Sequence, residues 1–480
     1  MTIKRGNKMK SITFFLLLVT FSNLHSQTVT LRDTTNQYDY IIITVPEFVD
    51  VCGPFKQHKE TVRDFRTLIV DTAQIYAEFD SSATPQDNIR DFISYAGTFW
   101  KEPRPKFFLI AGTVIDVPNF SIQSQVPPYT FFNSDYYYGS NVYDNDTTTT
   151  DFYIGRIPSK NSNELSNYFS KVIEYESNNT LLGWMNNNLF ICHSDTIYGF
   201  YQAAQYLANE ILPAYMRSYF ILDDTSSTYY GNKDSIINFV NNEGCAVIWF
   251  EGENSDSFFI SSDYFNLNDI QGFDNEPKYF FTVFVGPQHS ILETNTNLTK
   301  EMLVLQDAGS LGGSAFVGTA FWGIGNVMRR EIAERLFDPG IHSIGETFAL
   351  DNLIPSGGLY GYMKLITNLW ADPSLHLKYD TTVGVENVTD EIPQGFLLYQ
   401  NYPNPFNPTT TIKFALPLDS RVKINVFNSL GQLVETIMDK EMESGYHEVN
   451  FNASRLASGV YLYQLQAQDY VSVKKMLLIK

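Results

Sequence analysis

The sequence has few cysteines and few positive charges. Only three cysteines, Cys52, Cys192 and Cys245, occur among 480 residues, which is too few for a disulfide scaffold or a zinc ribbon. The 33 Lys and Arg residues are outnumbered by 53 Asp and Glu residues, so the formal net charge is −20. Because an acidic surface repels phosphate groups, this composition argues against nucleic-acid binding.

Several common motifs are also absent. No GxxxxGK[ST], GxGxxG or HExxH pattern occurs, which removes the usual signals of a nucleotide site or a zinc protease. No run after residue 26 has the length and apolar character of a transmembrane helix. Hydrophobic residues nevertheless make up 44% of the chain, and charged residues only 18%. This is the composition of a globular protein with room for two or three domains.

The N-terminus has the pattern of a secretory signal peptide. Four basic residues among the first ten precede the apolar run Ile12–Phe21, which is too short to span a bilayer as a helix. A plausible cleavage site follows Ser26, and removing residues 1–26 would take the net charge from −20 to −24. The sequence therefore predicts an exported protein.

The body of the chain reads as an α/β domain. Short runs rich in Ile, Val and Phe are typical of strands that are covered on both faces. These runs are Tyr40–Val45, Phe107–Ala111, Leu189–Cys192, Ala246–Phe250, Tyr279–Val285 and Ala315–Gly318. Helical patterns lie between them, at Asp87–Trp100, Glu164–Glu176 and Tyr201–Tyr215. The alternation predicts a mostly parallel sheet with helices on both faces and a site at the carboxyl ends of its strands.

The tail reads as a small β-sandwich. A polar linker at 381–398 leads into Tyr399–Pro408, where three prolines within six residues forbid a helix. Short alternating runs separated by Gly turns then predict strands. They are Thr411–Leu416, Val422–Phe427, Gln432–Met438, Tyr446–Phe451, Val460–Gln466 and Val471–Ile479.

This tail resembles the type A C-terminal sorting domain of proteins exported by the bacterial type IX secretion system. The matching segments are NYPNPFNPTTTIKFALP (401–417), VFNSLGQLV (426–434), SGYHEVNF (444–451), LASGVYLYQL (456–465) and KKMLLIK (474–480). The resemblance implies that the type IX machinery is a partner and that the protein passes through the periplasm and the outer membrane. It would then be secreted or held at the cell surface.

The body resembles the gingipain, or C25, family of cysteine peptidases. The matching segments are YDYIIITVPEF (38–48), NIRDFISYAGTFW (88–100), PKFFLIAGT (105–113), SDYYYGS (134–140), FYIGRIPSKNSNELSNYFSKVIEYE (152–176) and LWADPSLHL (369–377). The resemblance implies a caspase-like α/β fold over residues 27–380, with an N-terminal part at 27–165 and a caspase-like part at 166–380. The sorting domain would occupy residues 399–480.

The catalytic residues of that family do not match. The resemblance implies a His in a Gly-His-Gly turn after the strand that ends near Phe250, and a Cys at the end of the next strand. Alignment on Gly252 places Glu253 at the His position and Asn254 at the second Gly. Counting from Pro277 places the nucleophile at Phe284 or Val285. Counting back from Glu301 instead places it at Gly286 or Pro287, and no cysteine lies anywhere after Cys245.

Other residues leave an alternative open. A Ser255–His289 pair, with Glu251 or Glu253 orienting the His, would form a different dyad. Cys192 is followed by His193 at a strand end, but neighbouring strand residues point to opposite faces. We interpret all three cysteines as buried, while a disulfide between Cys245 and either Cys52 or Cys192 stays open.

The resemblance also implies structural calcium, although no cofactor is required for the expected chemistry. The candidate ligands are the loop carboxylates Asp135, Asp144, Asp146 and Asp151, since calcium takes six to eight oxygen ligands. The spacing matches no known loop motif.

Two function classes follow. The first is an exported gingipain-like protein that has lost the Cys/His dyad, whose cleft residues Glu251, Glu253 and Asn254 bind an extracellular protein or basic peptide. The second is an active cysteine endopeptidase or another hydrolase. The absence of a cysteine in the second half of the chain favours the first class.

Overall fold

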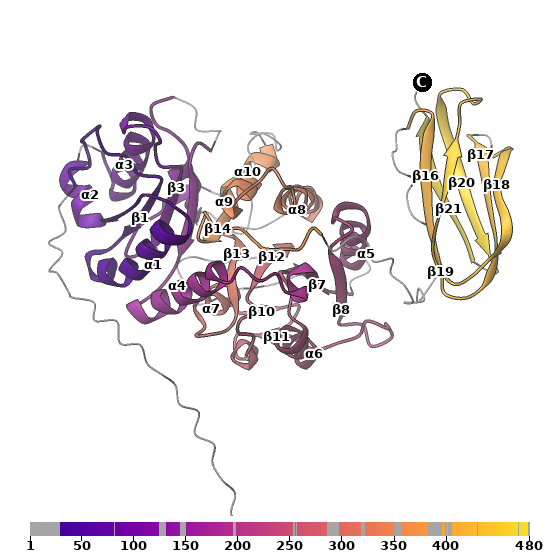
Figure 1. The fold of residues 1–480 in the computed structure, drawn as a ribbon, viewed down its shortest axis with the longest axis horizontal. Helices are drawn as coiled ribbons and strands as arrows, with labels where there is room; N and C mark the ends of the chain where they lie inside the picture. Colours follow the sequence, from indigo (N-terminus) through magenta and orange to yellow (C-terminus); the bar gives the residue numbers. More distant parts are fainter. Residues whose placement is uncertain are drawn as a thin grey trace, which may run out of the picture. The chain divides into compact units, whose positions relative to one another are not determined.

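The computed structural model consists of two compact units, the body up to Thr382 and the tail from residue 383 on (Figure 1). The predicted signal peptide and most of the expected linker lie outside the described residues. The structure describes residues 29–80, 82–123, 131–144, 150–194, 198–252, 255, 257–285, 297–317, 322–349, 358–382, 396–398, 401, 406–429, 431–468 and 470–478.

The expected alternation of strands and helices is confirmed, and the strands of the body divide between two main sheets. The first is a parallel four-stranded sheet of order β2-β1-β3-β6. Its strands are β1 (Tyr40–Thr44), β2 (Thr67–Asp71), β3 (Phe107–Ala111) and β6 (Tyr153–Ile157). Its helices are α1 (Val49–Val62), α2 (Thr72–Glu78) and α3 (Pro85–Phe99).

Both faces of this sheet are buried, which explains its continuous apolar runs. Ile42 belongs to the core that includes Phe55 of α1, whereas Ile41 and Ile43 belong to the core that includes Phe92 of α3. Successive strand residues therefore contact opposite layers of helix, as the alternation of side chains along a strand requires.

The second sheet has the order β14-β13-β12-β9-β7-β8 and is parallel except for β14, which runs antiparallel to β13. Its strands are β7 (Asn187–Cys192), β8 (Arg217–Leu222), β9 (Val247–Glu251), β12 (Phe280–Val285), β13 (Ser310–Phe316) and β14 (Thr367–Ala371). Its helices are α4 (Ser162–Ser177), α5 (Phe200–Tyr206), α6 (Lys233–Asn238), α7 (Leu298–Val304), α8 (Trp322–Leu336), α9 (Ile344–Phe348) and α10 (Gly358–Ile366).

Shorter elements complete the body. They are the strands β4 (Phe120–Gln123), β5 (Phe131–Ser134), β10 (Phe258–Phe259) and β11 (Phe265–Asn266), and the 3₁₀ turns Pro46–Phe48, Tyr136–Gly139, Gly183–Asn186 and Asp269–Gly272. The helix expected at Tyr201–Tyr215 is shorter than predicted. α5 passes into a π-helical turn at Leu207–Ile211 and ends at Leu212, because the residue before Pro213 is driven out of the helical conformation.

The two sheets of the body meet closely at β6 and β14. A Cβ added at Gly155 of β6 would lie 2.1 Å from the carbonyl oxygen of Ala371 in β14 and 2.8 Å from Pro373. Only glycine permits this approach, which accounts for the Gly of the Gly-Arg-Ile-Pro segment.

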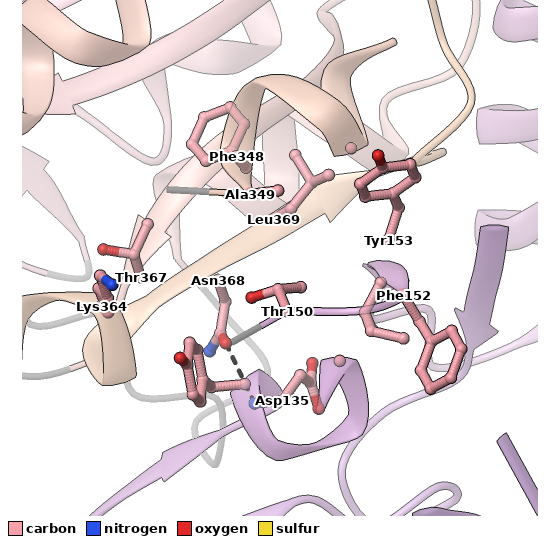
Figure 2. Close-up of a pocket in the computed structure, with 14 residues that line it drawn as sticks. Asp135, Thr150, Phe152, Tyr153, Phe348, Ala349, Lys364, Thr367, Asn368 and Leu369 are labelled. Carbon is pink, nitrogen blue, oxygen red and sulfur yellow. Dashed lines mark hydrogen bonds between the residues drawn. The ribbon is translucent and has the colours of Figure 1, made fainter. Parts of the chain in front are cut away.

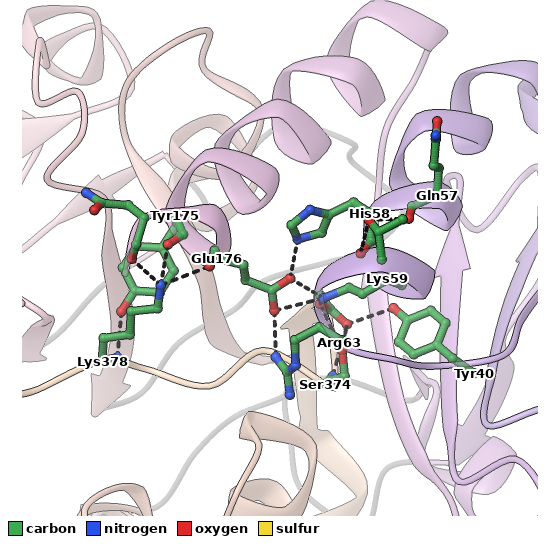
Figure 3. A network of polar contacts seen from close by, with 12 residues as sticks. Tyr40, Gln57, His58, Lys59, Arg63, Tyr175, Glu176, Ser374 and Lys378 are labelled. Carbon is green, nitrogen blue, oxygen red and sulfur yellow. Dashed lines mark hydrogen bonds and ion pairs between the residues drawn. The ribbon is translucent and has the colours of Figure 1, made fainter. Parts of the chain in front are cut away.

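A buried ion cluster joins the elements on either side of this contact (Figure 3). The Lys59 ammonium of α1 lies 2.5 Å from Asp372 Oδ2 and 2.7 Å from Glu176 Oε2, and all three side chains are almost wholly buried. Glu176 belongs to α4, and Asp372 directly follows β14. One cation thus holds together three segments that are distant in sequence.

The remaining oxygens of the cluster are also satisfied. Arg63 donates to Glu176 at 2.7 Å, and the His58 ring lies 2.8 Å from the same carboxylate. Asp372 accepts hydrogen bonds from the Tyr40 hydroxyl at 2.7 Å and the Ser374 backbone N–H at 2.9 Å. Such additional partners are what a buried ion pair needs to offset its desolvation.

A second buried ion pair supports the loops beside β3 and β6. Arg156 binds Asp135 through two hydrogen bonds, of 2.6 and 2.7 Å, and is fully buried. Its guanidinium also donates to the carbonyl oxygens of Gly112 at 3.1 Å and Val117 at 3.0 Å. These bonds fix the loop after β3 to the 3₁₀ turn that follows Asp135.

The tail is a β-sandwich, as expected from its alternating strands. One sheet has the order β15-β16-β19 and the other β18-β17-β20-β21, with antiparallel pairing throughout. The strands are β15 (Leu397–Leu398), β16 (Thr409–Leu416), β17 (Ser420–Asn428), β18 (Leu433–Met442), β19 (Gly445–Asn452), β20 (Gly459–Ala467) and β21 (Tyr470–Leu478). Inward-facing residues such as Ile412, Val422 and Tyr463 form its own core.

Among the described helices, none combines the length and the apolar character that crossing a membrane requires.

Replacing Lys59 by Met should strongly destabilise the body. The substitution keeps an apolar stem but leaves Glu176 and Asp372 buried without their shared cation, which costs about 3–5 kcal/mol. Urea unfolding followed by tryptophan fluorescence measures the loss. Lys56→Met is the matched control, because its exposed pair with Glu60 contributes at most about 1 kcal/mol. Equal effects of the two substitutions would contradict the role given to Lys59.

The stability of the body should fall at acid pH through Glu176. Burial raises the pKa of Glu176, but Lys59, the His58 hydrogen bond and Arg63 outweigh burial and lower the pKa to about 2. In the unfolded chain the pKa is about 4.3, so the stabilisation is complete above that pH and is lost as the pH falls through about 2. Glu176→Gln should flatten the dependence of unfolding free energy on pH between these values. An unchanged slope in that variant would refute this assignment.

Candidate functional site

The carboxyl ends of three neighbouring strands meet at one edge of the six-stranded sheet. Cys192 of β7 is in register with Glu251 of β9, and Val285 of β12 is in register with the same Glu251. This edge is where open α/β sheets build their sites. The loops after β9 and β12 are those that the resemblance identifies as catalytic.

The residues expected at the His position follow β9 directly. Glu253 and Asn254 lie outside the described residues, as does His289 on the next loop. The two strand residues considered for the nucleophile are described. Phe284 is buried and stacks on Phe250 with ring centroids 4.4 Å apart, and Val285 pairs with β9. Neither residue type carries a nucleophilic atom.

Glu251 is buried and paired, which differs from its expected place in an open cleft. Its Oε2 accepts a 2.7 Å hydrogen bond from Nη1 of Arg329 in α8, and Arg329 also donates to the carbonyl oxygen of Ala203. Burial raises the pKa of Glu251, although Arg329 opposes the shift. Because the carboxylate already has a cationic partner, Glu251 offers no free charge to a basic peptide.

Ser255 serves as a turn residue. Its hydroxyl oxygen accepts hydrogen bonds of 3.3 Å from the backbone N–H groups of Ser257 and Phe258, just before β10. This is a common local role of serine in a loop. Its expected partner His289 lies outside the described residues, so the Ser255–His289 dyad stays a prediction.

Polar side chains that directly follow β7 and β8 lie at the same edge of the six-stranded sheet. His193 Nε2 is 3.6 Å from Asp223 Oδ2, and the other oxygen of Asp223 accepts the Ser194 N–H at 2.6 Å. The backbone N–H of His193 donates to the carbonyl oxygen of Glu251 at 2.9 Å. The hydroxyl of Tyr264 is buried without a hydrogen-bond partner. Burial raises the pKa of Tyr264, and the Asp223 charge adds to the rise.

All three cysteines are free and fully buried. Burial raises the pKa of Cys52 to about 12 and also raises the pKa values of Cys192 and Cys245. The nearby Glu251 carboxylate contributes to the shift at Cys192. At neutral pH these thiols are protonated, whereas a nucleophile must be a thiolate.

Asp135, one of the acidic loop residues proposed for calcium, has another partner. Both oxygens of Asp135 bind Arg156, so this carboxylate does not fit a calcium site. Burial raises the pKa of Asp151, and the neighbouring Asp144 raises it further. Asp146 lies outside the described residues. Within the part of the chain that the structure describes, no three His, Cys, Asp or Glu side chains converge to hold a metal ion.

Sequence reasoning missed Asp223 and Arg329. Asp223 directly follows β8, whose apolar residues 219–222 would have identified a strand end by the same rule used for the other strands. Arg329 lies on α8, and its pairing with Glu251 spans 78 residues. No local pattern marks such a partner.

Comparison with known families supports both resemblances. A family model described as peptidase family C25 matches residues 33–378, and a model described as a secretion system C-terminal sorting domain matches residues 400–480. No curated protein matches the chain in sequence. Both assignments made from the sequence motifs are thus confirmed.

Solved structures share the fold. The Arg-specific cysteine proteinase gingipain R is 15% identical, with a TM-score of 0.58 over 92% of this chain and 98% of that chain. The complex of the pro- and mature domains of Porphyromonas gingivalis RgpB gives 15% identity and a TM-score of 0.56, over 92% of this chain and 100% of that chain. A structure described as a protease is 13% identical to this chain, with a TM-score of 0.58 over 93% of this chain and 98% of that chain.

At these identities the structures establish the fold and no activity. The C25 family model covers most of the chain, and the body has the parallel sheets expected of the caspase-like fold. The sorting domain directs such proteins through the type IX route to the cell surface or the extracellular space. The chain is therefore a member of peptidase family C25 that carries a type IX secretion sorting domain.

Proposed function

We propose that this protein is an exported member of the C25 family that no longer hydrolyses peptides and instead acts by binding at the cell surface or outside the cell. The observation that carries the proposal is the burial of every thiol in the chain. Cys52, Cys192 and Cys245 are free, fully buried and held protonated by burial.

The chemistry of a cysteine peptidase requires two groups in contact. A thiolate attacks the amide carbonyl, and an imidazole first takes the thiol proton and then returns it to the leaving amine. Losing both groups removes the mechanism. Glu253 at the His position and Val285 or its neighbours at the Cys position supply neither.

The position of Cys192 argues in the same direction. It lies at the carboxyl end of β7, which is separated by β9 from the expected position at the end of β12, and it belongs to the main apolar core of the body. The next residue, His193, makes its contact with Asp223. Because neighbouring residues of a strand point to opposite faces, the Cys192 sulfur could contact the His193 ring only if it lay on the other face of the strand.

The edge of the sheet keeps features of a binding surface. Glu251 and Arg329 neutralise one another, while the His193 and Asp223 side chains remain 28% and 17% exposed. The partner in this proposal is an extracellular protein or peptide.

The thiols should be unreactive in the folded protein. Ellman's reagent should modify none of the three cysteines at neutral pH and all three after denaturation in guanidinium chloride, because burial and the raised pKa values both protect them. Absorbance at 412 nm measures the number of thiols that have reacted. Stoichiometric reaction of one thiol in the native protein would contradict the burial on which the proposal rests.

The purified protein should show no turnover of casein or peptide substrates and no labelling by thiol-directed peptidase inhibitors. The variants Cys192→Ala and Cys245→Ala should behave as the wild type does. Hydrolysis that vanishes in either variant would restore the cysteine endopeptidase alternative. Hydrolysis that vanishes instead in Ser255→Ala or His289→Ala would establish the relocated dyad as a hydrolase site.

A further inference from the structure

The six-stranded sheet of the body has two lateral edges, formed by β14 and β8. The first sheet covers the β14 edge, since β6 approaches it at Gly155 and the Asn368 side chain of β14 accepts the backbone N–H of Asp135 at 3.1 Å (Figure 2). β8 forms the other edge and lies at the rim of the body in Figure 1. This lateral edge is distinct from the strand ends considered above.

The hydrogen bonds of Leu222 establish which backbone groups of β8 point outward. Its N–H donates to the carbonyl oxygen of Tyr229 at 2.9 Å, and its carbonyl oxygen accepts the N–H of Gly231 at 2.9 Å. Both groups therefore point away from β7. Because this direction alternates from residue to residue in a parallel strand, Ser218 and Phe220 also point away from β7, and the residues between them pair with it.

The outward groups of Ser218 and Phe220 are unpaired. Together they present two N–H donors and two carbonyl acceptors, and within the described residues no backbone or side chain pairs with them on that side. The segment Arg217–Ile221 is called the β8 edge below; at 3.3 Å per residue it is about 16 Å long. A row of unpaired strand groups is a template for an added strand.

Aromatic side chains flank the β8 edge on both faces. On one face the Phe220 ring centroid lies 5.6 Å from those of Tyr201 and Tyr229. On the other face Tyr219 lies 4.9 Å from Phe239 and is 37% exposed. Since the side chains of an added strand also alternate, they would contact an aromatic group on each face. Both contacts favour apolar side chains.

We propose that the β8 edge binds an extended segment of another protein as an additional strand. The segment would be about five residues long and carry apolar side chains on both faces. Backbone hydrogen bonds to Ser218 and Phe220 would hold it, and the flanking aromatic side chains would select its residues. The inference goes beyond the proposed function, because it concerns a different surface and holds whether or not the body hydrolyses peptides.

The structure argues against a second copy of this chain as the occupant. A two-fold axis requires antiparallel pairing, in which Ser218 of each copy lies opposite Phe220 of the other. Met216 of one copy would then lie opposite Leu222 of the other, where residues 229–231 already bind the backbone. Met216 cannot bend away, because its N–H is held in a turn by the carbonyl oxygen of Pro213 at 2.9 Å. A separate extended segment can end before this position.

Amide hydrogen exchange in the free full chain tests whether the edge is open. The Ser218 and Phe220 amides should exchange at least about tenfold faster than those of Tyr219 and Ile221, because only the latter two are bonded to β7. Mass spectrometry with single-residue fragmentation measures the rates. Equal protection of all four amides would show that the edge is already occupied, and would overturn the proposal.

Selection of displayed random ten-residue peptides on the immobilised full chain tests binding. Enriched peptides should contain alternating β-branched or aromatic residues, and a synthetic copy should bind saturably in fluorescence anisotropy. N-methylation of one alternate set of its residues should abolish binding, whereas N-methylation of the other set should not, because only one set faces the edge. Failure to enrich any peptide, or equal tolerance of both methylated sets, would overturn the proposal.

Substitutions in β8 locate the binding. Ser218→Pro removes an outward N–H and places a ring in the path of the added strand, so it should weaken peptide binding at least about tenfold. Ser218→Ala keeps the N–H and is its matched control. Tyr219→Lys places a charge on the edge without changing the backbone and should weaken binding by a similar factor. Tyr143→Lys, at a tyrosine of similar exposure beside α3, is the control for that charge.

Circular dichroism and the unfolding midpoint establish whether each variant is folded. If Ser218→Pro does not fold, Tyr219→Lys decides the test. Loss of affinity in the edge variants with full affinity in both controls would support the β8 edge as the binding surface. Unchanged affinity in folded Ser218→Pro or Tyr219→Lys protein would show that the peptide binds elsewhere, and would overturn the assignment.

Discussion

The arrangement of the body depends on one buried ammonium group, that of Lys59. It contacts Glu176 and Asp372 at hydrogen-bond distance, and thereby holds α1, α4 and the segment after β14 against one another. Lys378 extends the same connection, since its ammonium donates to the carbonyl oxygens of Tyr175, Glu176 and Asn178 at the end of α4. Because a buried charge without its partner is so unfavourable, these segments have one low-energy arrangement. The edge of the six-stranded sheet takes its position from that arrangement.

Several segments that identify the family have structural roles in this chain. The Asp of Ser-Asp-x-x-Tyr and the Arg of Gly-Arg-Ile-Pro form one buried ion pair, Asp135 with Arg156. The Gly before Arg156 allows β6 to approach β14, and Asp372 of the Ala-Asp-Pro-Ser-Leu segment binds Lys59. Substitution of these residues would disturb the contact between the two sheets of the body. The segments by which the chain matches the family over its body are thus segments that hold its two sheets together.

The strand ends themselves are occupied by groups that neutralise one another. Glu251 is bound by Arg329, and Asp223 lies beside His193 and the Ser194 N–H. A catalytic site needs a group whose pKa is tuned toward the working pH, whereas burial here moves the thiol pKa values away from it.

The class of fold could be predicted from the sequence, because strand and helix patterns are local. The apolar runs at Tyr40–Val45 and Tyr279–Val285, and the alternating strands of the tail, are visible within a few residues. The strand β8 went unrecognised, and with it Asp223. Which charged side chains contact one another could be read only from the three-dimensional fold. Tyr40 and Asp372 are 332 residues apart, Lys59 and Glu176 are 117 apart, and Glu251 and Arg329 are 78 apart. Such pairs follow from the path of the whole chain, which no periodicity in a short window contains.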